Sequence, residues 1–98
     1  MKINPNKELE NINGEALKDK DEKIITFKLV CINALLARFK NEAELEGVEK
    51  LSRWELAKKL NQEADEVDIT SEEAAKIKNI IGKAYGPDIV GPVYEILK

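Results

Sequence analysis

The sequence contains no histidine, a single cysteine and few aromatic residues. Without histidine, the chain lacks the side chain that most often acts as a general base near neutral pH and most often binds a metal. A single cysteine cannot form an internal disulfide framework. These absences argue against an enzyme that uses a Ser–His or Cys–His pair, and against a histidine-bound metal.

Long hydrophobic runs and glycine-rich loops are also missing. No stretch approaches the ~18 uncharged apolar residues of a membrane span, and the first residues show no signal-peptide pattern. The five glycines stand singly, so there is no glycine-rich phosphate loop. The charged run at residues 18–23 does not form a calcium loop opening at Asp19, because Ile24 and Val30 stand where glycine and glutamate are needed. We therefore expect a non-enzymatic cytoplasmic protein with no membrane segment, cofactor or metal site.

Basic character is weak as well. The chain has 16 Lys and Arg against 19 Asp and Glu, a net charge of −3, and two of its cations are arginines. A protein that binds nucleic acid through phosphate contacts usually shows a basic patch or stripe. No segment of this chain is strongly basic, so nucleic acid is a disfavoured partner.

The chain does have enough apolar sequence for one domain. Of its 98 residues, 43% are hydrophobic and 36% are charged, which is typical of a soluble globular domain with a charged surface. At this length the chain can bury one modest core. We expect a single domain over residues 1–98, with a polar β-hairpin arm at residues 1–23 and a helical core at residues 24–98.

The arm contains Asn13-Gly14, the dipeptide most typical of a tight β-hairpin turn. Both central residues of a type I′ turn need positive φ, which Asn and Gly tolerate. Weakly apolar flanks precede the turn at Leu9 and follow it at Leu17. The sequence therefore predicts a short two-stranded hairpin around this turn.

A helix is predicted over residues 26–40, with Thr26 as its N-cap. Apolar residues at helical spacing form one stripe on it: Ile25, Leu29, Ile32, Leu36 and Phe39. Further apolar residues occupy the opposite side, so we expect this helix at the centre of the fold or against another chain. Asn33, at the edge of the stripe, is expected to be a buried amide satisfied by backbone groups.

Two further segments extend the predicted core. After a connection at residues 41–47, a second helix runs over residues 48–62. We expect Trp54 in the core, and the stem of Arg53 packed within the apolar sector while its head reaches water or a carboxylate. Residues 65–69 alternate polar and apolar side chains, which indicates an extended link or a short edge strand.

Helix signals are clearest in the last third of the chain. Thr70 and Glu73 form a capping box that starts a third helix, and Gly86-Pro87 ends it. Pro87 can open a last helix, which Pro92 should kink or split. The predicted fold class is therefore mainly α (α+β), a short N-terminal β-hairpin followed by a compact bundle of three to four helices.

The last helix is the candidate partner interface. It brings a dense set of aliphatic residues and a tyrosine to the end of the sequence, and the helix at residues 26–40 needs more cover than three short helices provide. A protein partner or a homo-oligomer would supply that cover, and amphipathic tyrosines suit the rim of an interface. The alternative is that the last helix caps the core of the single chain. The candidate interface residues are Tyr85, Ile89, Val90, Val93, Tyr94 and Leu97.

The second functional hypothesis is a small DNA-binding transcriptional regulator of the helix-turn-helix type. Its recognition helix would be the third helix, with Lys76, Asn79 and Lys83 on an exposed face. The link that precedes this helix is long and acidic, whereas a helix-turn-helix has a tight turn there. We therefore place this hypothesis after one based on protein contacts.

Several short motifs resemble a family of small proteins encoded by bacteriophages and prophages. They lie at residues 30–37 (VCINALLA), 53–57 (RWELA), 66–70 (EVDIT), 82–85 (GKAY) and 90–97 (VGPVYEIL). The motifs follow the same order as in the family, and with the Asn-Gly turn of the polar arm the resemblance extends over most of the chain. The last one departs from the family by a proline where a polar residue is usual.

The resemblance implies a bacteriophage or prophage origin and brings no catalytic residue with it. We therefore expect a phage or prophage accessory protein that acts through protein–protein contacts, with virion morphogenesis as one such role. Such a protein would be found in the cytoplasm of the host cell or associated with the virion.

Overall fold

Helices dominate the regular structure of the chain, which the computed structural model describes over residues 1–42 and 44–98, with the backbone alone at Asn41. The predicted fold class, mainly helical with a small β element, is confirmed. Ala43, within the predicted connection, lies outside the described residues. In chain order the elements are β1 (Lys2–Ile3), α1 (Phe27–Leu36), the 3₁₀ turn η1 (Lys40–Glu42), α2 (Gly47–Leu60), β2 (Val67–Asp68), α3 (Ser71–Ala84) and α4 (Pro87–Ile96).

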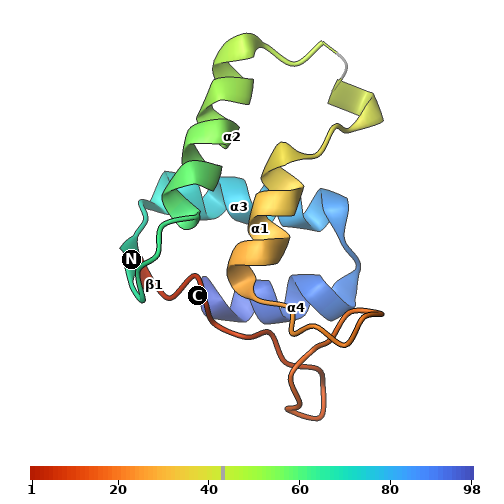
Figure 1. The fold of residues 1–98 in the computed structure, drawn as a ribbon. Coiled ribbons are helices and arrows are strands. Elements are labelled where there is room, and N and C mark those ends of the chain that lie inside the picture. Colours follow the sequence, from red (N-terminus) through yellow and green to blue (C-terminus); the bar gives the residue numbers. More distant parts are fainter. Residues whose placement is uncertain (43) are drawn as a thin grey trace.

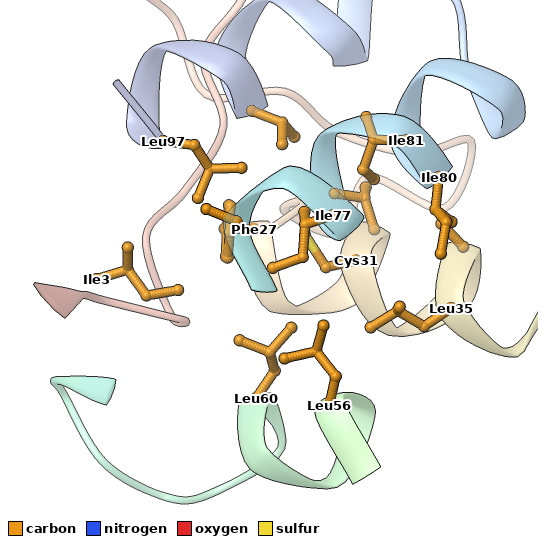
Figure 2. Close-up of a cluster of buried hydrophobic side chains, with 14 of the residues drawn as sticks. Ile3, Phe27, Cys31, Leu35, Leu56, Leu60, Ile77, Ile80, Ile81 and Leu97 are labelled. Atoms are coloured by element: carbon orange, nitrogen blue, oxygen red, sulfur yellow. The ribbon is translucent and has the colours of Figure 1, made fainter. Parts of the chain in front are cut away.

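The helices meet around one core. In Figure 1, α1 crosses in front of α3. Beside α1, α2 extends toward the top of the view, and α4 lies below α3. α1 contacts both α2 and α3, and α3 contacts α4. Figure 2 shows side chains from β1, α1, α2, α3 and the end of α4 converging between these elements: Ile3, Phe27, Cys31, Leu35, Leu56, Leu60, Ile77, Ile80, Ile81 and Leu97.

α1 is shorter than predicted and buries a different side. The Thr26 hydroxyl caps it as predicted, accepting from the backbone N–H of Leu29 at 3.2 Å. The predicted stripe is wrong at Leu29 and Leu36, which are exposed, and Asn33 is exposed instead of buried. Because α1 is apolar nearly all round, its own pattern does not specify which side the other helices cover. The buried residues of α1 are Phe27, Val30, Cys31, Ala34 and Leu35.

α2 buries Arg53, Leu56, Ala57 and Leu60, which recur at i, i+3, i+4 and i+7 on one side of a helix. The inward placement of Arg53 is as predicted. The prediction that Trp54 belongs to the core is wrong, since this residue is 52% exposed. Arg53 occupies the inward position beside it, which leaves the indole on the outer side of α2.

α3 begins with the predicted capping box. The Thr70 hydroxyl accepts from the Glu73 N–H at 3.0 Å, and the Glu73 carboxylate accepts from the Thr70 N–H at 2.9 Å. Glu73 also accepts from Lys59 of α2 at 2.8 Å. The start of α3 is therefore capped by its own residues and also bonded to α2.

α4 opens on Pro87 as predicted and continues without interruption through Pro92. Of the two outcomes predicted for Pro92, a kink or a split, the split is therefore wrong. Pro92 removes one backbone donor, and the buried residues Ile89 and Val93 anchor the helix on either side of it.

The short strands pair across the chain and not within the arm. β1 and β2 are antiparallel, with Lys2 opposite Asp68 and Ile3 opposite Val67. The short strand predicted at residues 65–69 is confirmed. This pairing fastens the start of the arm to the link between α2 and α3.

The arm reverses at Asn13-Gly14 as predicted, but its strands reduce to one bridge between Glu10 and Ala16. Gly14 has a φ of +82°, whereas Asn13 has no positive φ, so the predicted type I′ turn is wrong. The Gly14 N–H donates to the Asn11 carbonyl at 3.0 Å. This combination is a type I turn followed by a left-handed residue, the usual form of a three-residue hairpin loop.

The same turn recurs eight residues later in the sequence. The Glu22 N–H donates to the Asp19 carbonyl at 3.0 Å, and Glu22 has a φ of +61°. In each turn the first side chain, Asn11 or Asp19, accepts from two backbone N–H groups that follow it. Lys20 therefore holds in the second turn the position that Ile12 holds in the first.

Three backbone hydrogen bonds hold the two turns on a common base. Leu17 donates to Leu9 at 2.8 Å, Ile25 to Leu17 at 2.9 Å, and Leu9 to Ile25 at 3.0 Å. Leu9 is buried, and the other two side chains pack against the core. The turns therefore project from a fixed base into solvent.

Candidate functional site

Three of the six residues predicted for a partner interface lie inside the single chain. Ile89, Val93 and Leu97 belong to its core, the last two at 0% and 1% exposure. Their burial removes the reason for assigning these three to a partner surface. The other three are half-buried, and for them an interface role stays a prediction: Tyr85, Val90 and Tyr94.

Tyr94 is engaged with α3. Its hydroxyl donates to the Lys78 carbonyl at 2.7 Å, and the Lys78 ammonium lies 6.0 Å from the ring centroid. Gly82 allows this close approach, since a methyl group there would lie 3.3 Å from the Tyr94 hydroxyl. Tyr94 therefore fastens α4 to α3, and its apolar ring covers the chain's own helix.

Exposed large apolar side chains of the described residues concentrate instead on α1 and α2. On α1 they are Leu29 and Leu36, and on α2 they are Val48, Leu51 and Trp54. Large exposed apolar patches on soluble proteins mark binding surfaces. Leu36 and Trp54 also border a cleft, which is the candidate functional site.

The cleft lies between the end of α1, the connection at residues 37–46 and α2. We call it the α1–α2 cleft. It has a volume of about 600 Å³. In Figure 1 η1 lies to one side of the end of α1, and α2 begins at the top of the view. Six of the ten residues that line the cleft are apolar: Leu35, Leu36, Ala37, Phe39, Leu45 and Trp54.

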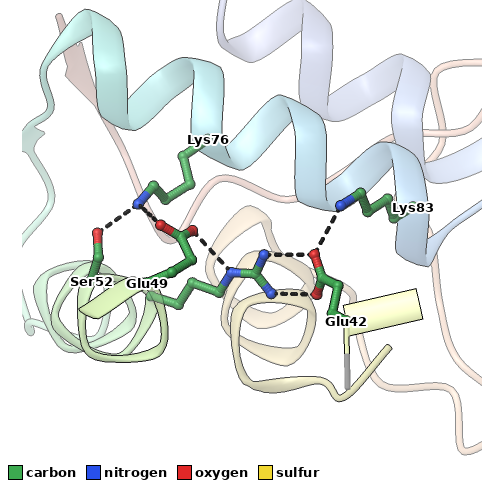
Figure 3. A network of polar contacts seen from close by, with 6 residues as sticks. Glu42, Glu49, Ser52, Lys76 and Lys83 are labelled. Carbon is green, nitrogen blue, oxygen red and sulfur yellow. Dashed lines mark hydrogen bonds and ion pairs between the residues drawn. The ribbon is translucent and has the colours of Figure 1, made fainter. Parts of the chain in front are cut away.

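Four charged residues complete the lining: Arg38, Glu42, Lys50 and Arg53. Arg53 is buried and binds both oxygens of Glu42 through two hydrogen bonds of 2.8 Å. Lys83 of α3 donates to the same carboxylate at 2.9 Å. Figure 3 shows how Glu42 joins η1 to α2 and α3 in this way. A bidentate guanidinium–carboxylate pair fixes orientation as well as distance, so this wall of the cleft is rigid.

Glu49 extends the network along α2. It accepts from the Arg53 Nε at 3.2 Å and from the Lys76 ammonium at 3.2 Å. Lys76 also donates to the Ser52 hydroxyl at 2.6 Å. Arg53 thus meets two carboxylates, which offsets the loss of hydration that its burial causes.

The network fixes the charges in this wall. Hydrogen bonds from Arg53 and then from Lys83 lower the pKa of Glu42 from 4.5 to about 2. Burial raises the pKa of Glu49, but hydrogen bonds from Lys76 and Arg53 outweigh it, so the pKa is lowered overall. Hydrogen bonding to Glu42 raises the pKa of Arg53. All three groups therefore stay charged at neutral pH.

Two cations of the lining, Arg38 and Lys50, have no ion-pair partner among the residues that the structure describes. Both are exposed, and Glu42, the carboxylate of the lining, is already paired. Glu44 and Glu46 are exposed in the connection but do not line the cleft. The lining therefore combines apolar side chains with an excess of positive charge, within a chain of net charge −3.

Most of the side chains predicted for DNA recognition form ion pairs within the chain. Lys76 is paired with Glu49 and Lys83 with Glu42, while Asn79 is exposed. Two of the three side chains of that hypothesis therefore hold α3 against neighbouring elements.

Other chemistry is sparse in the described part of the chain. Within residues 1–42 and 44–98, no cluster of three or more cysteine or acidic side chains is placed to hold a metal ion. No described helix has the length and apolar character to cross a membrane. The Cys31 thiol is buried, and that burial raises its pKa, which makes it a poor nucleophile.

Comparisons of the chain with models of protein families, with curated proteins and with solved structures find no match. The resemblance to small phage and prophage proteins therefore stays a prediction. What can be said of function depends on the geometry of the α1–α2 cleft.

Sequence analysis missed the central residue of this site, Trp54, because a lone tryptophan is most simply a core residue. A signal was nevertheless present. Val48, Leu51 and Trp54 recur every third residue, whereas the buried stripe of α2 begins at Arg53 and continues through Leu56. Two apolar rows on one helix, of which the core can cover only one, indicate a second contact surface.

Proposed function

We propose that this protein acts through contacts with other protein chains, and that the α1–α2 cleft is its contact surface. The observation that carries the proposal is the exposure of Trp54, at 52%, and of Leu36, at 49%, on the border of the same cleft. Tryptophan is the residue type most enriched among those that dominate binding energy at interfaces. An exposed indole beside an apolar cleft is therefore typical of a binding site.

The rigid wall supports this role. The Arg53–Glu42 pair and its links to α3 hold one side of the cleft in place before any partner arrives. A contact surface that is already ordered loses less conformational entropy on binding. Leu45 and Phe39, on the connection, add half-buried apolar area that a partner could cover further.

The biological setting that we propose comes from the resemblance, as a phage or prophage accessory protein with a role such as virion morphogenesis. Two of the motifs that carry the resemblance, at residues 30–37 and 53–57, contribute to the cleft. Leu36 comes from the first and Trp54 from the second. The resemblance and the proposed contact surface therefore involve the same part of the chain.

Affinity capture from induced prophage-carrying cells, followed by mass spectrometry, tests the proposal. Three baits are compared: the natural chain, Trp54→Ser, and Lys58→Ser as a control at an exposed position of α2 outside the cleft lining. We expect a set of phage proteins that the natural chain and the Lys58 variant recover and the Trp54 variant loses. Recovery of the same proteins by all three baits would contradict the assignment of the cleft. Enrichment of DNA without phage protein would favour the transcriptional regulator.

A further inference from the structure

Ile12 is a large apolar side chain that stands fully exposed at the tip of the first turn of the arm. The turn does not require it, because Lys20 holds the same position in the second turn with the same backbone hydrogen bonds. Covering an exposed isoleucine is favourable because it removes apolar surface from water, and no part of the described chain covers this one. Its chemistry therefore suits a contact outside the single chain.

The two turns also differ in charge. Within the first turn, at residues 10–16, the charged side chains are Glu10 and Glu15, which are both acidic and exposed. The second turn, at residues 18–23, carries three lysines and three acidic residues. The first turn is thus an acidic surface with an apolar tip, whereas the second is polar and balanced.

The α1–α2 cleft has the complementary character. Its lining includes six apolar residues, and the cations Arg38 and Lys50 in it have no ion-pair partner among the described residues. In Figure 1 the first turn lies at the bottom of the molecule and the connection that borders the cleft lies at the top. The molecule is 40 Å long, so the turn cannot reach the cleft of its own chain.

We propose that Ile12 of one copy inserts into the α1–α2 cleft of a second copy, with the surrounding glutamates facing Arg38 and Lys50. This inference rests on the proposed function of the cleft as a protein contact surface. The contact joins two different surfaces, so in a pair the first copy keeps a free cleft and the second keeps a free turn. Such head-to-tail contacts close into rings or extend into filaments.

The contact has two measurable properties. A turn in a cleft buries little surface, which places it in the class of small, weak interfaces. The association therefore increases with protein concentration over about 10 μM to 1 mM. Because exposed opposite charges meet around the isoleucine, the association weakens when salt is raised from about 0.05 to 0.5 M.

Sedimentation velocity of four purified chains tests the inference: the natural chain, Ile12→Lys, Trp54→Ser and Lys20→Ser. Ile12→Lys gives the first turn the residue that the second turn already carries, so the arm keeps its fold, which circular dichroism checks. We expect the natural chain and the Lys20 variant to associate equally. The Ile12 and Trp54 variants should associate at least about tenfold more weakly, the loss typical of a residue that dominates an interface.

Mixing the two defective variants provides the decisive measurement. The Trp54 variant keeps an intact turn and the Ile12 variant keeps an intact cleft, so the mixture should form a 1:1 dimer that grows no further. A monomeric natural chain at 1 mM, an Ile12 variant that associates normally, or a mixture that stays monomeric would each overturn the inference. If capture from cells still depends on Trp54 in that case, the proposed function stands with a different partner. If capture does not depend on Trp54 either, both proposals fail.

Discussion

The two ends of the helical core differ in whether the chain covers their apolar side chains. At the α3–α4 end, Val93 and Leu97 are covered by the chain itself, and Tyr94 is bonded to α3. At the α1–α2 end, Leu36 and Trp54 remain in solvent beside a cleft. A dense apolar pattern in the sequence therefore does not by itself mark a partner surface. What marks one is apolar area that the rest of the chain leaves uncovered.

The largest effect that we expect comes from truncation at the covered end. Leu97→Ala should lower the free energy of unfolding by about 2–3 kcal/mol, because it removes a buried side chain and leaves a cavity. Urea denaturation followed by circular dichroism measures the loss. Leu97→Met, which keeps the volume, should recover most of it. An unchanged stability of Leu97→Ala would contradict the burial of this residue in the core of the single chain.

A smaller loss of stability is expected at Arg53, which pairs with Glu42 of η1 and with Glu49 of α2. Arg53→Ala removes the guanidinium that binds Glu42 and Glu49, and should lower the free energy of unfolding by about 1–2 kcal/mol. Arg53→Lys keeps the charge but cannot form the two parallel hydrogen bonds, so we expect an intermediate loss in thermal denaturation. Equal stability of Arg53→Lys and the natural chain would show that charge alone, and not the bidentate geometry, holds the wall.

The same network predicts a pH dependence. The pKa of Glu42 is about 2 in the folded chain against an ordinary 4.5, so the unfolded chain binds a proton first as the pH falls. The stabilisation from Glu42 is therefore complete above about pH 4.5 and is lost progressively toward pH 2. Urea midpoints measured across this range should fall, and those of Glu42→Gln should fall less. Parallel profiles for the two proteins would contradict the bonding of Glu42 to Arg53 and Lys83.

Local signals in the sequence were sufficient for the helices that have one-sided patterns. The capping box at Thr70 and Glu73 starts α3 where predicted, and Pro87 opens α4. These features depend on neighbours within one helical turn, so the sequence contains all the partners that decide them.

The side of α1 that is buried could not be predicted, because the choice depends on helices that follow it in the chain. α2 and α3 cover the side of Cys31 and Leu35, and leave Leu36 in solvent. The cleft could not be predicted either, because it depends on which side of α1 is covered and on the burial of Arg53. Without that information, Trp54 was assigned to the core. The pairing of β1 with β2 was also beyond local pattern, since its two strands are far apart in the sequence.

A modest effect is expected from the hydrogen bond that joins α4 to α3. Tyr94→Phe removes the hydroxyl that donates to the Lys78 carbonyl at 2.7 Å, and should lower the free energy of unfolding by about 0.5–1 kcal/mol. Chemical denaturation resolves a change of this size when the slopes are equal. If the half-buried Tyr94 served a partner and not the chain itself, the variant would be as stable as the natural protein.

Only a small effect on stability is expected at Trp54, although it is the largest side chain on the border of the cleft. Half of this residue is already in solvent, so Trp54→Ser should lower the free energy of unfolding by about 1 kcal/mol or less, well below the loss at Leu97. The same variant should lose partner binding, because an indole at a contact surface contributes to the complex and little to the free chain. Thermal denaturation and binding measured on one preparation separate the two. A loss of stability comparable with that of Leu97→Ala would show that Trp54 belongs to the core, and the two ends of the molecule would then not differ in the way proposed.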